Sequence, residues 1–169
     1  MRHLRLERPG IGVALIELDD LARANALSLG LSEELGETMG LLDADQSVGA
    51  VVITGAGKAF CAGADLSQLG ESRAEGLRAI YEGFLCVANS PLATIAAVNG
   101  AAVGAGLNLA LACDVRLAGP RARFDCRFLD LGIHPGGAPQ GPPHHPTLRH
   151  ELPPPGTVNK TNCPLTVSK

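Results

Sequence analysis

The pattern of apolar and polar positions divides the first 134 residues into short elements. Strict alternation over 11–18 predicts a half-buried strand, and apolar residues recurring every three or four positions over 28–42 predict an amphipathic helix. Two short apolar runs, 48–54 and 94–98, are typical of buried parallel strands. The full set of predicted strands is a stretch containing Leu4, Leu6 and Arg8, then 11–18, 48–54, 94–98 and 115–118, and the predicted helices are 28–42, 72–87 and 107–113.

Two glycine-rich loops interrupt this succession. One loop, 55–66, follows the strand 48–54, and the other, 99–106, follows the strand 94–98. Repeated strands, loops and helices predict an α/β fold in which right-handed crossovers place helices over a sheet. Because both loops follow strands of one predicted sheet, we expect their backbone N–H groups to point the same way.

The sequence changes character near residue 135. Nine of the twelve prolines lie in 135–169, whereas all five aromatic residues lie before this point. A proline-rich segment without helical or strand periodicity cannot bury enough apolar surface to offset the entropy lost on ordering. We therefore predict one folded domain over 1–137 and a disordered tail over 138–169.

Composition narrows the function classes. The net charge of −3 argues against a nucleic-acid-binding protein, which carries a basic patch, and no polybasic segment suits a membrane surface. The five cysteines are widely spread without a CxxC pair, which favours reduced thiols and a cytoplasmic protein over disulfides or a zinc site. The uncharged run 83–113 is long enough for a membrane span, but its Ala, Gly, Asn and Pro content favours a buried strand and a buried helix.

The glycine-rich loops do not match the common phosphate-binding motifs. Val52 stands where a P-loop has its first glycine, Ala59 stands where it has Ser or Thr, and neither loop has the third glycine of a dinucleotide-binding fingerprint. Two interpretations remain. The loops form tight turns with close helix–sheet packing, or two backbone N–H groups converge on one oxygen as an oxyanion hole. Small residues at 62–64 and 104–106 would let an acyl group approach the backbone.

Four segments carry a longer pattern across the first 137 residues. They are RANAL at 23–27, FCAGADL at 60–66, AVNGAAVGAG at 97–106 running into LALACD at 109–114, and LGIHPGG at 131–137. Together they resemble the crotonase (enoyl-CoA hydratase/isomerase) superfamily. The resemblance implies the ClpP/crotonase type of α/β fold, a spiral core of ββα units. It also implies an acyl-CoA thioester as the ligand, with no cofactor beyond the CoA that the substrate carries.

The resemblance further implies roles for individual residues. The N–H groups of Ala64 and Ala105 would hold the thioester oxygen and stabilise an enolate. The substrate, including its CoA moiety, would contact Arg23, Ala24, Ala62, Ala64, Asp65, Leu66, Ser67 and Ala105, with Arg23 near the phosphates. Asp65 is equally suited to cap the N-terminus of a helix.

The chain departs from the family at both catalytic carboxylates. Enoyl-CoA hydratases use two glutamates, and Asn108 and Phe128 stand at these positions here. Neither side chain takes a proton near neutral pH, although Asn108 is able to orient a water or a carbonyl. Asp130 is the first candidate for a replacement base, ahead of Asp125 and His134. The tail histidines have no carboxylate partners, so no metal site is expected.

The family pattern stops at Gly137, where family members continue into helices that cover the acyl pocket and help to build trimers or hexamers. We therefore expect an incomplete core that lacks the C-terminal helical part and much of the trimerisation region, as a truncated gene or a shifted reading frame would produce. Three functions stay open: a hydratase or isomerase of fatty-acid metabolism, a non-catalytic acyl-CoA-binding protein, and a truncated product without independent function.

Overall fold

The computed structural model describes residues 3–65 and 73–127, which form two sheets and three α-helices. The strands are β1 (Leu4–Gly10), β2 (Val13–Leu18), β3 (Ala50–Gly55), β4 (Ala59–Cys61), β5 (Ala93–Val98), β6 (Ala101–Val103), β7 (Val115–Ala118) and β8 (Arg123–Asp125). The helices are α1 (Leu29–Asp43), α2 (Arg73–Ala88) and α3 (Ala105–Ala112), and a short 3-10 helix, η1, spans Leu21–Arg23.

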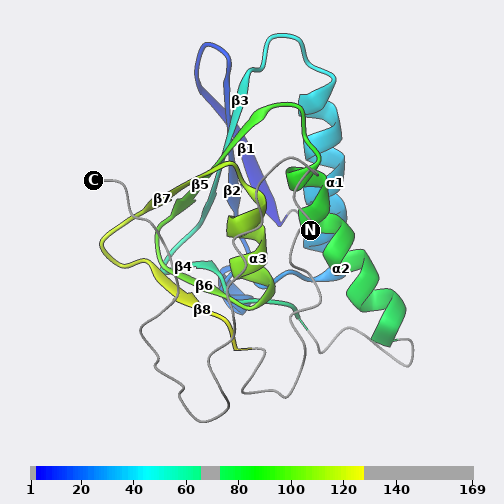
Figure 1. The fold of residues 1–169 in the computed structure, drawn as a ribbon, viewed down its shortest axis with the longest axis vertical. Coiled ribbons are helices and arrows are strands. Elements are labelled where there is room, and N and C mark those ends of the chain that lie inside the picture. The colour runs from blue at the N-terminus through cyan, green and yellow to red at the C-terminus, as the bar shows by residue number, and fades with distance from the viewer. Residues whose placement is uncertain (1–2, 66–72, 128–169) are drawn as a thin grey trace, which may run out of the picture. The chain divides into compact units, whose positions relative to one another are not determined.

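The larger sheet confirms the strands predicted from the sequence. Its order is β1-β2-β3-β5-β7, with β1 antiparallel to β2 and all other neighbours parallel. Alternate residues of β2, β3 and β5 are buried, and the remaining residues are mostly half-buried. These strands therefore have one buried face rather than two, because α1 and α2 lie on the same side of the sheet (Figure 1).

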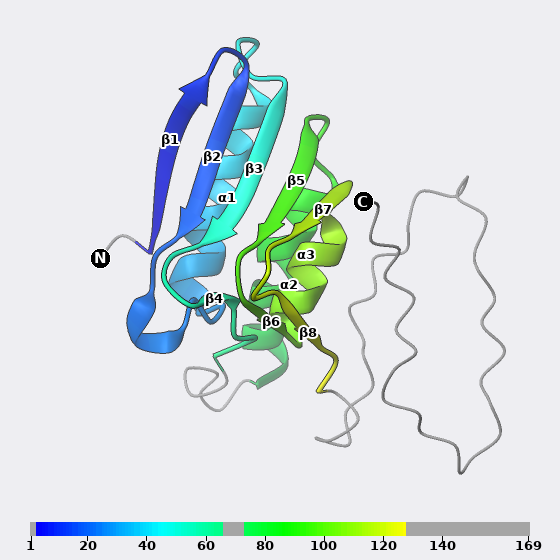
Figure 2. The ribbon, with the colours of Figure 1, turned by 90° about the vertical axis from the view of Figure 1, so that its left-hand side faces the viewer.

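The smaller sheet is a correction to the sequence prediction, which treated 55–66 and 99–106 as loops. Its order is β4-β6-β8, and its strands pair in parallel. Each of β3, β5 and β7 is followed along the chain by one strand of this sheet, which lies near its carboxyl end (Figure 2). The three strands, Ala-Phe-Cys, Ala-Ala-Val and Arg-Phe-Asp, are each too short to show a period by which the sequence could reveal them.

The helices form where helical spacing predicts them. The Ser28 hydroxyl accepts a hydrogen bond from the Leu31 N–H at 3.1 Å and so caps α1. The apolar positions of α1 face the core, where Leu31, Leu35, Met39 and Leu42 are buried. α2 crosses α1 at Gly83, where an added Cβ would collide with Ser32.

The uncharged run 83–113 contains the end of α2, then β5, β6 and α3, as the strand-and-helix interpretation predicts. In the part of the chain that the structure describes, no helix combines the length and the apolar character needed to cross a membrane.

Candidate functional site

The two glycine-rich segments lie side by side at the smaller sheet. Ala59 of β4 pairs with Ala101 of β6 in the parallel register. Further along, a Cβ on Gly63 would come within 3.1 Å of the Val103 carbonyl oxygen. A Cβ on Gly106 would overlap the backbone of Cys61. The glycine at 106 therefore lets the first turn of α3 rest directly on the end of β4.

The backbone N–H group of Ala64 makes no hydrogen bond to the described residues. Ala64 forms an isolated parallel bridge with Leu27, in which the Leu27 N–H donates to the Gly63 carbonyl at 2.7 Å and the Asp65 N–H donates to the Leu27 carbonyl at 2.9 Å. In this arrangement the bridged residue directs its own N–H away from the neighbouring strand. No hydrogen bond of the Ala64 N–H is found among the described residues.

The backbone N–H group of Ala105 likewise has no acceptor in the part of the chain that the structure describes. Ala105 is the first residue of α3, so its N–H has no partner within the helix. Gly104 before it has a φ of +52°, a conformation that favours glycine, and its N–H donates to the Asp125 carbonyl at 2.9 Å. Ala64 and Ala105 are the residues whose N–H groups the sequence assigned to an oxyanion hole, and they lie on segments in van der Waals contact.

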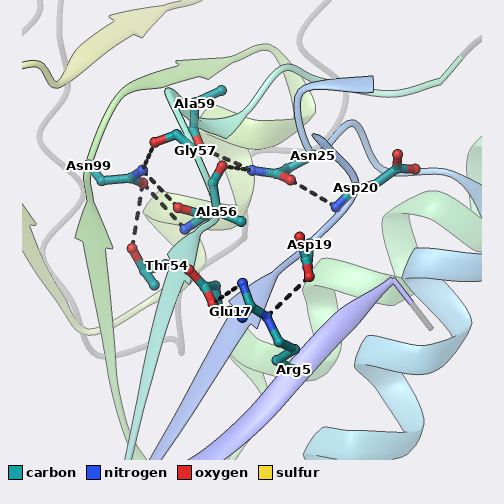
Figure 3. Close-up of polar contacts among 11 residues, drawn as sticks. Arg5, Glu17, Asp19, Asp20, Asn25, Thr54, Ala56, Gly57, Ala59 and Asn99 are labelled. Atoms are coloured by element: carbon teal, nitrogen blue, oxygen red, sulfur yellow. Dashed lines mark hydrogen bonds and ion pairs between the residues drawn. The ribbon is translucent and has the colours of Figure 1, made fainter. Parts of the chain in front are cut away.

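Asn25 holds the turn between β3 and β4 from one side. It follows η1, is completely buried and has a φ of +60°. Its Nδ2 donates to the carbonyl oxygens of Ala56 at 2.9 Å and Ala59 at 3.0 Å, and its Oδ1 accepts from the Asp20 N–H at 3.0 Å (Figure 3). The single side chain therefore ties the segment 20–25 to the start of β4.

Asn99 holds the same turn from the other side. It follows β5, and its Nδ2 donates to the Gly55 carbonyl at 2.7 Å while its Oδ1 accepts from the Gly55 N–H at 3.3 Å (Figure 3). We call Asn25 and Asn99 the asparagine clamp. Both residues lie in the segments that resemble the family, but the sequence predicted no role for either of them. For Asn99 a usable signal was present, since an asparagine stands directly between a buried strand and a glycine.

The Arg23 guanidinium lies between two carboxylates. Its Nη1 is 3.0 Å from Asp20 Oδ2, and its Nε is 3.2 Å from Asp65 Oδ2. The Ala62 N–H donates to the Ala24 carbonyl at 3.1 Å, so the two segments assigned to CoA contact are neighbours. A CoA phosphate at Arg23 would compete with both carboxylates. Residues 66–72, which follow Asp65, lie outside the described residues, so the cap role suggested for Asp65 stays a prediction.

The Nδ2 atom of Asn108 is buried and has no hydrogen-bond partner among the described residues. Asn108 is the fourth residue of α3 and is 5% exposed, and its Nδ2 has no acceptor among the described residues. An unsatisfied buried donor of this kind costs about 1–3 kcal/mol. The amide is neutral and takes up no proton near neutral pH, so Asn108 is unsuited to act as a general acid or base.

Other titratable groups near the site are poorly suited to acid–base or nucleophilic chemistry. The Asp125 carboxylate accepts hydrogen bonds from the Arg127 side chain and backbone N–H, which hold its pKa below the usual range and make it a weak base. Burial raises the pKa of the Cys61 thiol to about 12 and that of Cys113 to about 12. Both thiols are therefore protonated at neutral pH.

Several predicted site residues lie outside the described residues: Leu66, Ser67, Phe128, Asp130 and His134. Within 3–65 and 73–127, no three His, Cys, Asp or Glu side chains gather as metal ligands.

Known proteins resemble this chain in both sequence and fold. The family described as enoyl-CoA hydratase/isomerase matches residues 9–141. The probable enoyl-CoA hydratase EchA14 of Mycobacterium tuberculosis is 57% identical over 129 residues, which are 74% of this chain and 50% of the relative. A crystal structure of an enoyl-CoA hydratase from Bacillus anthracis matches with a TM-score of 0.76 at 36% identity, over 81% of this chain and 55% of that chain.

A probable enoyl-CoA hydratase/isomerase from Mycobacterium abscessus matches with a TM-score of 0.71 at 36% identity, over 81% of this chain and 54% of that one. The chain thus spans about half the length of the relatives that it matches.

Proposed function

This chain belongs to the enoyl-CoA hydratase/isomerase (crotonase) family, and from that premise we propose that it binds an acyl-CoA thioester. The thioester oxygen accepts hydrogen bonds from the N–H groups of Ala64 and Ala105. The observation that carries the proposal is that neither N–H group has an acceptor among the described residues, while their segments are in contact. The N-terminus of α3 adds to the attraction for a partly negative oxygen.

The CoA moiety lies along the two segments that the bridge at Leu27 joins. In this proposal its contacts are Arg23, Ala24, Ala62, Asp65, Leu66 and Ser67, largely through backbone groups. Because Arg23 already pairs with two carboxylates, we expect it to contribute little charge to phosphate binding.

We propose binding without efficient hydration of an enoyl-CoA. Positioned acid–base groups contribute roughly 10²–10⁴-fold each, and the two family positions carry Asn108 and Phe128. Hydration of crotonyl-CoA should therefore stay close to the rate in buffer. Hydration far above that rate, lost in Asp130→Asn, would instead favour a hydratase in which Asp130 is the base.

The binding proposal is tested with two ligands that differ in one oxygen. Butyryl-CoA has the thioester carbonyl, whereas S-butyl-CoA has a CH2 group in its place. By calorimetric titration of the full chain, we expect butyryl-CoA to bind about tenfold more tightly, because two hydrogen bonds contribute about 0.5–1.5 kcal/mol each. Equal affinities would remove the oxyanion hole from the proposal, and binding of neither ligand would overturn acyl-CoA binding.

Ala105→Pro sharpens this test. Proline is favoured at the first position of a helix and has no N–H, so the variant removes the donor without breaking α3. We expect the preference for the thioester over the thioether to disappear while the thermal transition of the protein is retained.

A further inference from the structure

Unpaired positive charge gathers along one border of the molecule. β7 ends the larger sheet and β8 ends the smaller sheet, so 115–125 forms an outer border of both sheets (Figure 2). Arg116, Arg121 and Arg123 are exposed on this border, and none of them forms an ion pair with a described carboxylate. We call these three arginines, together with the exposed Val115 and Leu117, the arginine border.

Elsewhere in the described part of the chain, arginines are paired. The arginines outside the border whose side chains the structure describes each have a carboxylate partner: Arg5, Arg8, Arg23, Arg78 and Arg127. The nearest carboxylates along the chain are already engaged, because Asp114 accepts hydrogen bonds from Thr94 and Asp125 pairs with Arg127. The border is therefore positively charged on a chain whose net charge is −3, and it favours a negatively charged partner.

The border does not suit pairing with its own counterpart. Two exposed edge strands of the same sequence are able to pair across a twofold axis. Such pairing of two β7 strands would bring the arginines of both copies together, and like charges opposed across an interface are unfavourable. The complementary surface must therefore be acidic.

Unpaired negative charge gathers on α1. Glu33 and Glu37 are exposed and form no ion pair within the described ranges, and Leu41 is 72% exposed. Residues four apart on a helix are neighbours, so these three side chains make one stripe, which we call the glutamate stripe. Gly36 and Gly40 flank it, and a Cβ on either would meet nothing within 4 Å beyond the backbone of the helix. Long arginine side chains would therefore have room to reach both carboxylates.

The arginine border and the glutamate stripe lie on different sides of the molecule. Both views show α1 apart from β7, with α1 on the helix-covered face of the larger sheet and β7 at its edge (Figures 1 and 2). One copy of the chain is therefore unable to bring its own two surfaces together, whereas two copies are able to do so.

We propose that the arginine border of one copy binds the glutamate stripe of a second copy, head to tail. Guanidinium–carboxylate pairs fix the orientation, and Leu41 of one copy packs against Val115 and Leu117 of the other. Charge and apolar surface are thus matched by the same contact. Because the contact joins two different surfaces, its repetition closes into a ring or extends as a filament. This association does not depend on the acyl-CoA binding proposed above.

Sedimentation velocity of the full chain tests for the association. We expect species larger than the monomer whose share rises with protein concentration. That share should fall when NaCl is raised from about 50 mM to about 500 mM, because salt screens exposed charges. A monomer at the highest concentration that stays in solution would overturn the proposal, and the border would then suit only an acidic partner of different sequence. Association that is insensitive to salt would overturn it as well.

Charge reversal on each surface identifies the contact. Arg121→Glu with Arg123→Glu makes the border negative, and Glu33→Arg with Glu37→Arg makes the stripe positive. Each double variant alone should associate about tenfold more weakly or worse, because like charges then face each other. In an equimolar mixture the negative border of one variant meets the positive stripe of the other, so association should return. Without that recovery the pairing of these two surfaces would be wrong.

Two further variants keep the result interpretable. Arg121→Gln with Arg123→Gln removes the charges without reversing them and should weaken association less than the glutamate substitutions do. Arg78→Glu reverses an exposed charge on α2, outside both surfaces, and should leave association unchanged. Equal weakening by Arg78→Glu would show that net charge controls association, which would overturn the proposal. The thermal transition of each variant establishes that it is folded.

Discussion

The two segments that carry Ala64 and Ala105 lie next to each other, but different interactions hold them in position. The turn after β3 is held mainly by side-chain hydrogen bonds from the asparagine clamp. The segment after β5 is held by contact of glycines with the opposite backbone, at Gly100 against Lys58 and at Gly106 against Cys61. Losing one of several hydrogen bonds weakens the first segment by a limited amount. A glycine pressed against a neighbouring backbone leaves no room for even one added carbon. The first segment shares this limit at Gly55, where β3 ends and a Cβ would overlap the carbonyl oxygens of Ala59 and Phe60, so both segments should tolerate added carbons poorly at their glycines.

Gly106→Ala should have the largest effect on this comparison. The new Cβ would overlap the Cys61 backbone, so α3 would have to move away from β4. We expect a loss of about 3 kcal/mol of unfolding free energy, the upper end of the range for overpacking, and loss of any preference for thioester over thioether ligands. Urea unfolding and ligand titration measure the two effects.

Gly40→Ala is the matched control for that substitution. Gly40 lies in α1 with open space around its Cβ position, so the same change should raise the unfolding free energy by about 0.5–1 kcal/mol. If both alanine variants changed stability equally, close packing at Gly106 would not explain the result.

Asn25→Ala should have the next largest effect. It leaves the buried carbonyls of Ala56 and Ala59 and the Asp20 N–H without their partner, and it places alanine at a positive φ. We expect a loss of about 3 kcal/mol from these two causes together. Asn25→Gly removes the same hydrogen bonds but tolerates the backbone conformation, so chemical denaturation should find it about 1 kcal/mol more stable than Asn25→Ala.

Asn99→Ala should cost less, about 1–2 kcal/mol, because Asn99 is only half-buried and water replaces part of its bonding to Gly55. In both clamp variants we expect the ratio of thioester to thioether affinity to fall, and to fall further in the variant that loses more stability. A clamp variant that unfolds more easily yet keeps the full ratio would show that the clamp supports the fold and not the position of Ala64.

Substitution of Asp45 should have the smallest effect on stability, and Asp45 lies outside both segments. Hydrogen bonds from Ser47 and Arg8 lower the Asp45 pKa from 3.8 to about 2. Because the folded state holds the lower pKa, the contribution to stability is present above the unfolded value and is lost as the pH falls from about 4 to about 2. Thermal unfolding of Asp45→Asn should show a smaller decline across this pH window than the unaltered chain.

At neutral pH, Asp45→Asn should leave the affinity for butyryl-CoA unchanged. A change in affinity would mean that a surface charge influences the segments that carry Ala64 and Ala105. Hydrogen bonds and close packing alone would then not account for their behaviour.

The elements that have a hydrophobic period are determined by the sequence alone. The alternation in β2 and the helical spacing in α1 each contain enough repeats to identify one face, and Ser28 at the start of α1 acts as the predicted cap. The segments that resemble the family likewise pointed to the backbone positions Ala64 and Ala105. Such motifs are recognised by their order along the chain, without knowledge of their contacts. The family resemblance also predicts that Asn108 stands where family members carry a carboxylate.

Tertiary structure alone decided how the glycine-rich segments are used. β4, β6 and β8 are three residues long, and their strand conformation depends on pairing with chain segments some 20 to 40 positions away. The roles of Asn25 and Asn99 depend on carbonyl groups of a turn that is distant in the sequence. That Asn108 Nδ2 has no acceptor among the described residues depends likewise on which parts of the chain pack against it. Such contacts join residues that no local pattern connects, so they exist only once the chain is folded.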